Sequence, residues 1–465
     1  MRLMPPLAAL PVTRMRNSSL CLVLKPLRRN QHHLTSFSFL VTTLLYILLF
    51  FSQQQQQNGS QSQVSQCHQY SSSSKHSWTA GSNNTAGFPV SAADKNSSSS
   101  EVLRLSRPFL NYLVGNLHNS NFPGARNYSE YHLIQHPQRF QILPSSVQPL
   151  RADFGPVVND VTSFGYPIEI APCRNATTSS KASNNGRSIG LFLAVISAPS
   201  YFNKRDVIRK TWLSQLAQLN NAGDTAAPAA VKLVGHGFIV GLTEDEDIKK
   251  RIEEESATHG DILQVDVMDT YPNLTRKVTA VLNWINSRCS RAEFVLKVDD
   301  DVYVNTHNLI SVVRSLNSSH LSIVGSSADG IVRRDGKFAV SVDDWPWKNY
   351  PPYSMGAFLL MSGCVIQPLL AAAQTTPYFP FEDTYIGLCA DKARVKMRFS
   401  PRALGEVMTN KPQPCYIHNS ISWLTQSVKV AYLSHHATEE FYRNVTRCKK
   451  LILAPIKTPR KFDFT

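Results

Sequence analysis

The sequence predicts an α/β domain whose central sheet is mostly parallel. Two observations support this prediction. Apolar, strand-like segments alternate with helix-like segments from about residue 187 onward, and the first of them, 189–196, contains no polar side chain. Strands buried on both faces of a parallel sheet have such runs, and the helices that connect them cover the two faces. Roughly 270 residues are available for this domain, which is enough for one well-formed core.

The first strand is expected at 189–196, an apolar run with the sequence IGLFLAVI. A helix is expected to follow at 204–216, because apolar residues recur there at helical spacing. The second strand is expected at 238–242. The helix after it, 244–255, has its acids first and its bases later, which is the order that the helix dipole favours.

The third strand is expected at 261–265, and the next helix at 273–289, again from apolar residues at helical spacing. The fourth strand, 294–298, is apolar except for Lys297 and ends where a run of acids begins. This order of elements completes the α/β pattern.

Three consecutive carboxylates, Asp299, Asp300 and Asp301, follow this strand directly. Carboxylates that are buried together repel one another and lose hydration, so a cation is expected to neutralise them. The carboxyl ends of parallel strands are where ligands bind, and oxygen-only ligands suit Mn²⁺ or Mg²⁺, which keep positions open for substrate phosphates. The sequence therefore predicts a divalent metal that holds a phosphorylated donor, with a solvated acidic turn as the alternative.

Residues 34–51 form an uncharged apolar stretch that is just long enough to span a bilayer. Basic residues precede it and no acidic residue occurs before Asp94, so the positive-inside rule places residues 1–33 in the cytosol and the rest in a lumen. The alternatives are a signal peptide, for which no clear small-residue cleavage site follows, and a mitochondrial presequence, for which the apolar stretch is long. We expect a single-pass, type II membrane protein.

The Gln and Ser runs of residues 52–150 cannot bury enough apolar surface to fold, so this segment is expected to be a disordered stem. The folded domain is expected at 151–448, followed by a basic tail at 449–465. The net charge of +15 comes mainly from the two ends of the chain. A nucleic-acid site would need its basic excess on the folded surface, so no nucleic-acid partner is expected.

Two further features agree with a secretory lumen. Eight Asn-X-Ser/Thr sites occur beyond the apolar stretch, at Asn58, Asn83, Asn96, Asn127, Asn175, Asn273, Asn317 and Asn444. The folded domain has an even set of six cysteines, which suggests disulfides: Cys173, Cys289, Cys364, Cys389, Cys415 and Cys448. The sequence does not determine which of them pair.

Five motifs resemble those of the β-1,3-galactosyltransferases, a family of inverting β-1,3-glycosyltransferases that also holds N-acetylglucosaminyl and Fringe-type members. They begin at Arg205 (RDVIRKTW), His259 (HGDI, continued by DTYPNLTRK), Lys297 (KVDDD), Tyr350 (YPPYSMG) and Phe381 (FEDTYIG). Each motif alone is weak. Because all five occur in the family's order, the resemblance is specific.

The resemblance implies a GT-A-like, Rossmann-type domain that the apolar stretch anchors in the Golgi membrane. It implies transfer of galactose from UDP-galactose, in β-1,3 linkage with inversion, to a glycan on a glycoprotein, proteoglycan or glycolipid. One alternative is a β-1,3-N-acetylglucosaminyl- or N-acetylgalactosaminyltransferase on the same scaffold. Another is a membrane-anchored glycan-binding protein, against which the intact acidic motifs argue, since binding alone needs no base.

The resemblance also assigns roles to the acids. Asp301 would bind Mn²⁺, and Asp299, with Asp300 beside it, would contact the nucleotide-sugar. Asp383 is the candidate base, because an acceptor hydroxyl must lose a proton as it attacks the anomeric carbon. Glu382 is expected to be structural or to line the acceptor site. From local sequence alone, these last two acids could equally mark a helix start.

Four more residues are candidates for the donor site. Arg205 and Arg209 lie four apart on one helix face and could reach the donor or pair with acids that order the helix. Asp266 is expected at the uridine or ribose. Lys277 is expected either at a phosphate or on a solvated helix face.

Aromatic residues suggest where an acceptor sugar would bind, because sugars stack their apolar faces on rings. Trp345, Trp347 and Tyr353 are the candidates, with a packed loop as the alternative. His435 precedes a Glu-Glu pair, as a metal-binding His does in the family, although the spacing is one residue short. For His435 the alternative is a surface His pair.

Overall fold

The computed structural model describes residues 124–144, 146–174, 188–221 and 230–448. The apolar stretch 34–51, most of the expected stem and the basic tail lie outside these ranges. Among the residues described, no helix combines the length and apolar character needed to cross a membrane. The described part begins within the expected stem, whose last residues include a helix, so the expected boundary at residue 150 is too late.

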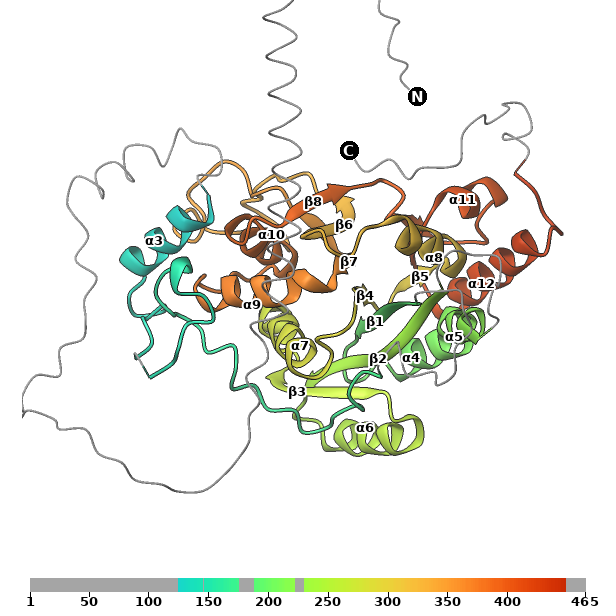
Figure 1. Ribbon diagram of the computed structural model, residues 1–465, viewed down its shortest axis with the longest axis horizontal. Coiled ribbons are helices and arrows are strands. Elements are labelled where there is room, and N and C mark those ends of the chain that lie inside the picture. Colours follow the sequence, from blue (N-terminus) through green and yellow to red (C-terminus); the bar gives the residue numbers. More distant parts are fainter. Residues whose placement is uncertain (1–123, 145, 175–187, 222–229, 449–465) are drawn as a thin grey trace, which may run out of the picture. The chain divides into compact units, whose positions relative to one another are not determined.

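The described residues contain one sheet of seven strands in the order β3-β2-β1-β4-β7-β6-β8 (Figure 1). The strands are β1 (Ser188–Ile196), β2 (Ala230–Leu242), β3 (Ile262–Met268), β4 (Phe294–Asp299), β6 (Ser322–Ser327), β7 (Ser354–Ser362) and β8 (Lys396–Phe399). Neighbouring strands are parallel except at β7, which is antiparallel to both β4 and β6. The prediction of a mostly parallel sheet is confirmed.

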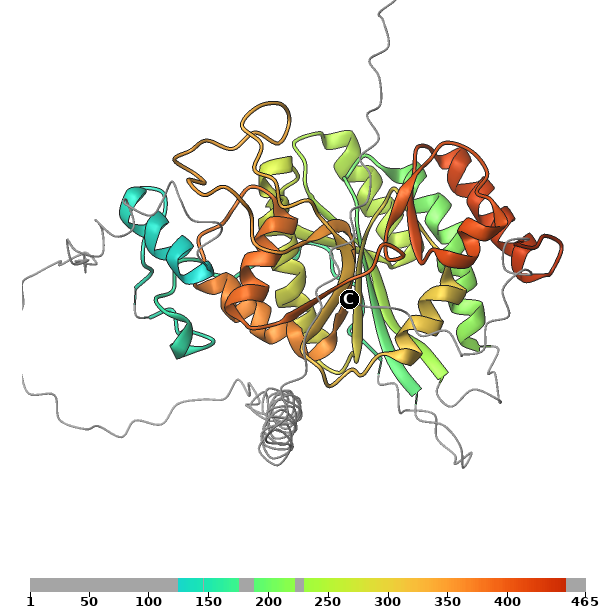
Figure 2. The same ribbon diagram turned by 90° about the horizontal axis from the view of Figure 1, so that it is seen from above.

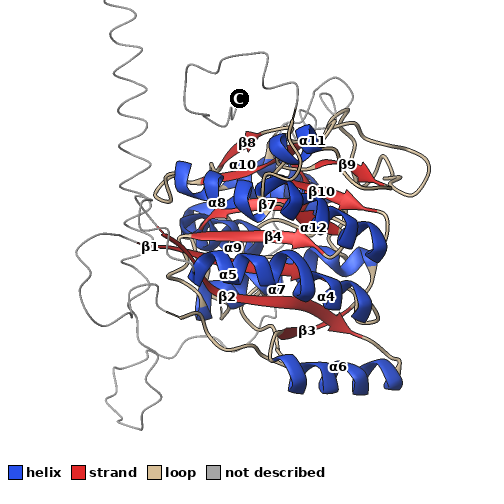
Figure 3. Cartoon of the chain, turned by 90° about the vertical axis from the view of Figure 1, so that its right-hand side faces the viewer, coloured by secondary structure: helices blue, strands red, loops and turns tan. Residues whose placement is uncertain are grey.

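The helices lie on both sides of this sheet (Figures 2 and 3). They are α3 (Ala125–Gln135), α4 (Phe202–Ile208), α5 (Ser214–Asn221), α6 (Glu246–His259), α7 (Leu274–Arg288), α8 (Thr306–Ser315), α9 (Ile366–Gln374), α10 (Glu382–Lys392), α11 (Pro414–Asn419) and α12 (Val428–Tyr442). Short helical turns are η1 (Ala152–Phe154), η2 (Arg209–Leu213), η3 (Tyr271–Asn273) and η4 (Gly363–Val365). The helix expected at 204–216 is thus interrupted, because η2 is a π-helical turn with non-helical dihedrals at Thr211.

Two apolar clusters explain why β1 is apolar after its first residue, Ser188. Phe192 and Ala194 belong to the cluster that includes α3, α7, α9 and α10. Leu191, Leu193 and Val195 alternate with them and belong to the cluster that includes α4, α5, α8 and α12. Because successive side chains of a strand point to opposite faces, a strand covered on both faces has no polar alternation.

A second sheet follows the acids. Its strands are β5 (Val302–Val304), β10 (Ser422–Thr425) and β9 (Gly405–Met408), in that order. The N–H and the hydroxyl of Thr425 both donate to the carbonyl oxygen of Asp301, at 2.7 and 3.0 Å. This sheet therefore fixes the backbone at the last of the three acids.

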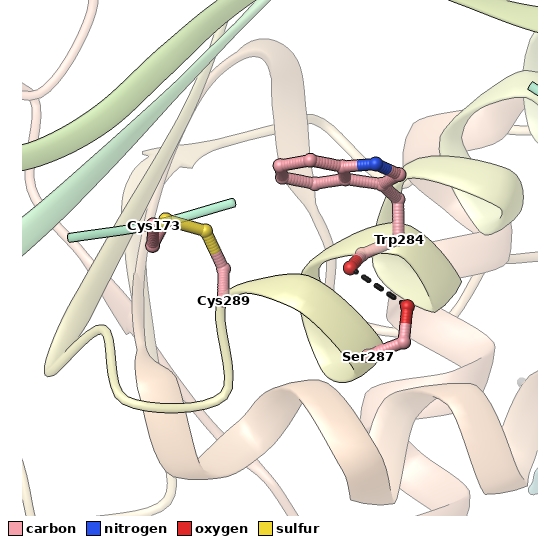
Figure 4. Close-up of a disulfide and its surroundings, with 4 residues drawn as sticks. All are labelled: Cys173, Trp284, Ser287 and Cys289. Carbon is pink, nitrogen blue, oxygen red and sulfur yellow. Dashed lines mark hydrogen bonds between the residues drawn. A yellow bond between two sulfur atoms is a disulfide. The ribbon is translucent and has the colours of Figure 1, made fainter. Parts of the chain in front are cut away.

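Two disulfides are formed between described residues. Cys173–Cys289 joins the segment before β1 to the end of α7, near the buried ring of Trp284 (Figure 4). Cys415–Cys448 joins α11 to the segment after α12. Cys364 is also disulfide-bonded. Because Cys389 is a free, buried thiol, the six cysteines do not form the self-contained even set that was expected.

Candidate active site

One buried ammonium lies at the centre of the candidate site. Lys297 is the fourth residue of β4, and its side chain is 2% exposed. Its Nζ atom lies 2.9 Å from Oδ1 of Asp299, 2.6 Å from Oε1 of Glu382 and 2.6 Å from the carbonyl oxygen of Gly356. Burial lowers the pKa of Lys297, but the carboxylates of Asp299 and Glu382 outweigh it and raise the pKa above its usual value. The KVDDD, YPPYSMG and FEDTYIG motifs therefore meet at one cation.

Strand pairing and one glycine explain how these segments meet. β4 and β7 are antiparallel neighbours, with Val298 opposite Phe358, so the start of β7 lies beside the end of β4. α10 begins at Glu382, directly after the extended residue Phe381. A Cβ atom at Gly356 would lie 2.6 Å from Oε2 of Glu382, so only glycine leaves room for this carboxylate.

The two acids at the start of α10 differ in burial. Glu382 is 6% exposed, whereas Asp383 is half-buried. Burial raises the pKa of Glu382 to about 7, although the charge of Lys297 opposes the rise. Burial also raises the pKa of Asp383, against a hydrogen bond of 2.7 Å that the N–H of Thr384 donates to its Oδ1 atom. Asp383 is thus the more accessible carboxylate of the pair, and a raised pKa suits it to accept a proton.

Two tyrosines from other elements lie near Asp383. Tyr271 belongs to η3 and is 48% exposed, whereas Tyr353 precedes β7 and is partly buried. Burial raises the pKa of each phenol, to about 12 for Tyr353, and the charge of Asp383 adds to the rise. The charge of Asp383 thus acts on two tyrosine hydroxyls, one from η3 and one from the segment before β7.

A second ammonium, that of Lys204, contacts the acids that follow Asp299. Nζ of Lys204, on α4, is 2.8 Å from Oδ1 of Asp300 and 4.2 Å from the ring centroid of Tyr201. Burial raises the pKa of Asp300 and Lys204 opposes the rise, while burial and the charge of Asp299 raise the pKa of Asp301. The acids thus form one repelling group with a lysine at each side.

A cavity of about 420 Å³ opens beside this group, between α4, β10 and the start of α12. Lys204, Asp300 and Asp301 form its charged part, and Thr425 and Gln426 are also among its lining residues. Side chains of α4, η2 and α12 make the remainder mostly apolar. This is a place where a charged group of a ligand can meet the acids.

The carboxylates fit an oxygen-liganded divalent cation. Asp300 is buried, and its Oδ2 atom has no hydrogen-bond partner among the described residues. Within the same residues, no three His, Cys, Asp or Glu side chains are grouped so that they could hold a metal ion. His435 is not brought to the acids by any recorded contact. Its Nδ1 atom is 3.2 Å from the hydroxyl of Tyr303, and its Nε2 atom is 3.8 Å from Glu439.

Comparison with known proteins identifies the domain. Residues 203–401, which include all the residues around Lys297, match the family model described as galactosyltransferase. These residues are similar to the galactosyltransferase family. This confirms the resemblance seen in the five motifs.

The relatives of this chain differ in the sugar that their names give. It is 36% identical over 217 residues to a human acetylgalactosaminyl-O-glycosyl-glycoprotein β-1,3-N-acetylglucosaminyltransferase, covering 45% of this chain and 54% of that protein. It is 29% identical over 210 residues to human β-1,3-galactosyltransferase 5, covering 44% of this chain and 64% of that protein. The chain thus spans about half the length of the first relatives it matches. A solved galactosyltransferase, LgtC, matches with a TM-score of 0.28 and 12% identity, which is too low to carry an argument.

Arg205 and Arg209 pair with acids that order the helix, which is the second of the two roles expected for them. Arg205 is fully buried and uses its guanidinium on Glu255, on the hydroxyl of Ser197 and on the backbone carbonyls that follow β1. Arg209 pairs with Glu255 and Asp261 at 2.7 Å. These contacts order the helix, and the expectation that Arg205 reaches a donor is wrong because no part of it is accessible.

Lys277 lies away from the surroundings that were expected. Lys277 is 3% exposed and donates to Asp269 and to the carbonyl oxygen of Ser197, each at 2.7 Å. It is therefore neither on a solvated helix face nor free to meet a phosphate. Asp266 is exposed on β3, the edge strand of the sheet, with its carboxylate beside Gly165.

Trp345 and Trp347 form a packed loop rather than an acceptor platform. Their side chains are 0% and 1% exposed. Trp345 packs 5.4 Å from Tyr128, and Trp347 packs 5.4 Å from Tyr131, both of α3. The prediction that these rings bind a sugar is wrong, because a helix from the expected stem covers them.

Two important lysines were missed from the sequence. Lys297 interrupts an otherwise apolar strand, and a buried polar residue in such a strand needs a partner. That signal was available, but its partner Glu382 lies far along the chain. Lys204 gave no signal, because a lysine early in a helix is ordinarily solvated.

Replacing Glu382 by Gln is expected to increase stability, relative to the native chain, as pH rises through 7. The folded-state pKa of Glu382, about 7, lies above its usual value of 4.5. Protonated Glu382 therefore stabilises the folded state fully at pH values below the pKa that this residue has in the unfolded chain. This stabilisation is lost as the pH rises through the pKa that it has in the folded protein. Gln imitates the protonated acid and keeps that contribution. Melting temperatures of both proteins across this range test the prediction, and a pH-independent difference between them contradicts it.

Proposed function

We propose that this protein is a β-1,3-glycosyltransferase that transfers galactose from UDP-galactose to a hydroxyl of a glycan acceptor, with inversion. The observation that supports this best is the meeting of the KVDDD and FEDTYIG acids at Lys297 inside a galactosyltransferase-family domain. Such a site offers carboxylates for a metal-bound donor beside a separate carboxylate for an acceptor. The β3-β2-β1-β4 order, with the acids at the end of β4, is consistent with a GT-A-like fold.

In the proposed reaction, the acceptor hydroxyl attacks the anomeric carbon of the donor sugar on the face opposite the diphosphate. A bond forms between the acceptor oxygen and that carbon. The bond from the carbon to the phosphate oxygen breaks, and its electron pair leaves with UDP. The hydroxyl proton passes to the carboxylate of Asp383, whose pKa is raised by burial.

Asp301 is the residue proposed to hold Mn²⁺, with Asp299 toward the nucleotide-sugar. When bound there, the ion would neutralise the charge that develops on the departing diphosphate. Lys204 adds a positive charge on the same side of the acids. The fit rests on the repelling carboxylates and on the unpartnered oxygen of Asp300.

A second candidate function is transfer of N-acetylglucosamine in β-1,3 linkage. The relative at 36% identity favours it, because its name gives that sugar. N-acetylgalactosamine on the same scaffold is a further donor to test. UDP release from a purified fragment, measured with each UDP-sugar and a panel of terminal galactosides and N-acetylhexosaminides, separates these activities. No UDP release with any pair would leave only the glycan-binding alternative.

Replacing Asp383 by Asn is expected to lower transfer by about 10²–10⁴-fold, which is what a general base contributes. The amide keeps the shape of the side chain but cannot take the proton. Affinity for the UDP-sugar should persist, because Asp299 and Asp301 lie on other elements. Glu382→Gln is the matched control and should lose less transfer. If Glu382→Gln abolishes transfer and Asp383→Asn retains it, the base has been assigned to the wrong acid.

Replacing Asp301 by Ala is expected to abolish Mn²⁺-supported transfer, because the site loses a charged metal ligand. The melting temperature should change little, since the backbone of this residue, and not its carboxylate, contacts β10. Initial rates with and without EDTA provide the measurement. Turnover by the native protein that is unaffected by EDTA would contradict the proposed role of Asp301 as a metal ligand.

We also propose a single-pass, type II protein of the Golgi membrane, anchored by residues 34–51, with the galactosyltransferase-family domain in the lumen. The charge pattern around this stretch and the eight Asn-X-Ser/Thr sites support the proposal. Glycosidase treatment of the membrane fraction should increase the gel mobility of the chain. A chain that is released by alkaline extraction and unaffected by glycosidase would be incompatible with this topology.

A further inference from the structure

The ammonium of Lys297 contacts three oxygen atoms. It donates hydrogen bonds to the carboxylate of Asp299 and to the carbonyl oxygen of Gly356, at 2.9 and 2.6 Å, and it forms an ion pair of 2.6 Å with the carboxylate of Glu382. The three oxygens come from separate segments: the end of β4, the start of β7 and the first turn of α10. The lysine therefore holds each segment relative to the other two.

The two carboxylates differ in what they face. The Asp299 side chain is 34% exposed and belongs to the acids at the end of β4, whereas the Glu382 side chain is 6% exposed. Glu382 precedes Asp383 directly, so fixing its carboxylate fixes the first turn of α10. In surroundings of low polarity the charges of this group interact strongly, because little water screens them.

We infer that Lys297 is a positioning residue that places Asp299 for the donor and Asp383 for the acceptor hydroxyl through one shared ammonium. This inference rests on the proposed function. The inference goes beyond the proposed function, because it assigns the alignment of the donor site and the acceptor site to a residue that touches neither substrate. A displacement of about 1 Å at a reacting group can cost roughly 10²-fold in rate, so loss of such alignment has a large effect on turnover.

The alternative is that the ion pair of Lys297 has only a structural role. The pH dependence of kcat distinguishes this from a positioning role. The acids at the start of α10 are faced by Lys297 and Asp299 from β4, by Tyr271 from η3 and by Tyr353 before β7. Lys297 is the cation among these groups. Removing it raises the pKa of Asp383, so the base would remain protonated to a higher pH.

The test compares Lys297→Met with Lys297→Arg and with Lys392→Met. Lys392 is the control, because it is a partly buried lysine at the other end of α10 whose ammonium donates to the carbonyl oxygen of Thr375 at 2.6 Å. For Lys297→Met we expect kcat to fall about 10²-fold, and the acid limb of kcat against pH to move upward by about 1 unit. The Arg variant should restore the position of the acid limb. The control should keep the native profile even if it melts earlier.

A double variant, Lys297→Met with Glu382→Gln, provides for the case in which Lys297→Met does not fold. It leaves no unpaired charge at Glu382, and it should fold but still show the low kcat. Full turnover in either variant, with an unmoved acid limb, would overturn the role of Lys297 and leave the proposed function intact. Absence of transfer by the native protein with every UDP-sugar would overturn both.

Discussion

The buried ion pair between Lys297 and Glu382 is the constraint on which the rest of the candidate site depends. Both side chains are almost completely removed from water, and an unpaired charge in such surroundings costs several kcal/mol. The chain must therefore bring α10 against β4 closely enough for contact. Gly356 is required for the same reason, since any side chain there would collide with the carboxylate. The orientation of Asp383 follows, because it is the next residue of the same helical turn.

The sequence predicted the central sheet well because strands covered on both faces leave an unambiguous pattern. The runs that became β1, β3 and β4 are apolar for this reason. It also indicated a ligand site at the acids that follow β4, since several charges at the end of a buried strand are unusual without a ligand. The later strands β6, β7 and β8 were not predicted. One of them reverses the sheet direction, and an apolar run by itself does not show its direction or its neighbours.

The roles of individual side chains were predicted less well, because a role depends on partners that lie far along the chain. Arg205 and Lys297 are both buried cations paired with acids, yet one orders a helix after β1 and the other joins the KVDDD and FEDTYIG motifs. Their sequence surroundings do not distinguish these outcomes. The tryptophans show the same problem. An aromatic residue in a loop is compatible with a sugar platform or with a core, and only the position of α3 decides between them.

The packing of α3 also determines what counts as one folding unit. Tyr128 and Tyr131 lie outside residues 203–401, but their rings complete the apolar cluster around Trp345 and Trp347. Asp391, near the end of α10, accepts a hydrogen bond of 2.9 Å from the N–H of Ala125 at the start of the same helix. The unit that folds together is therefore longer than the segment that matches the family model. A fragment cut at residue 151 would carry every acid of the site and still leave two tryptophans uncovered.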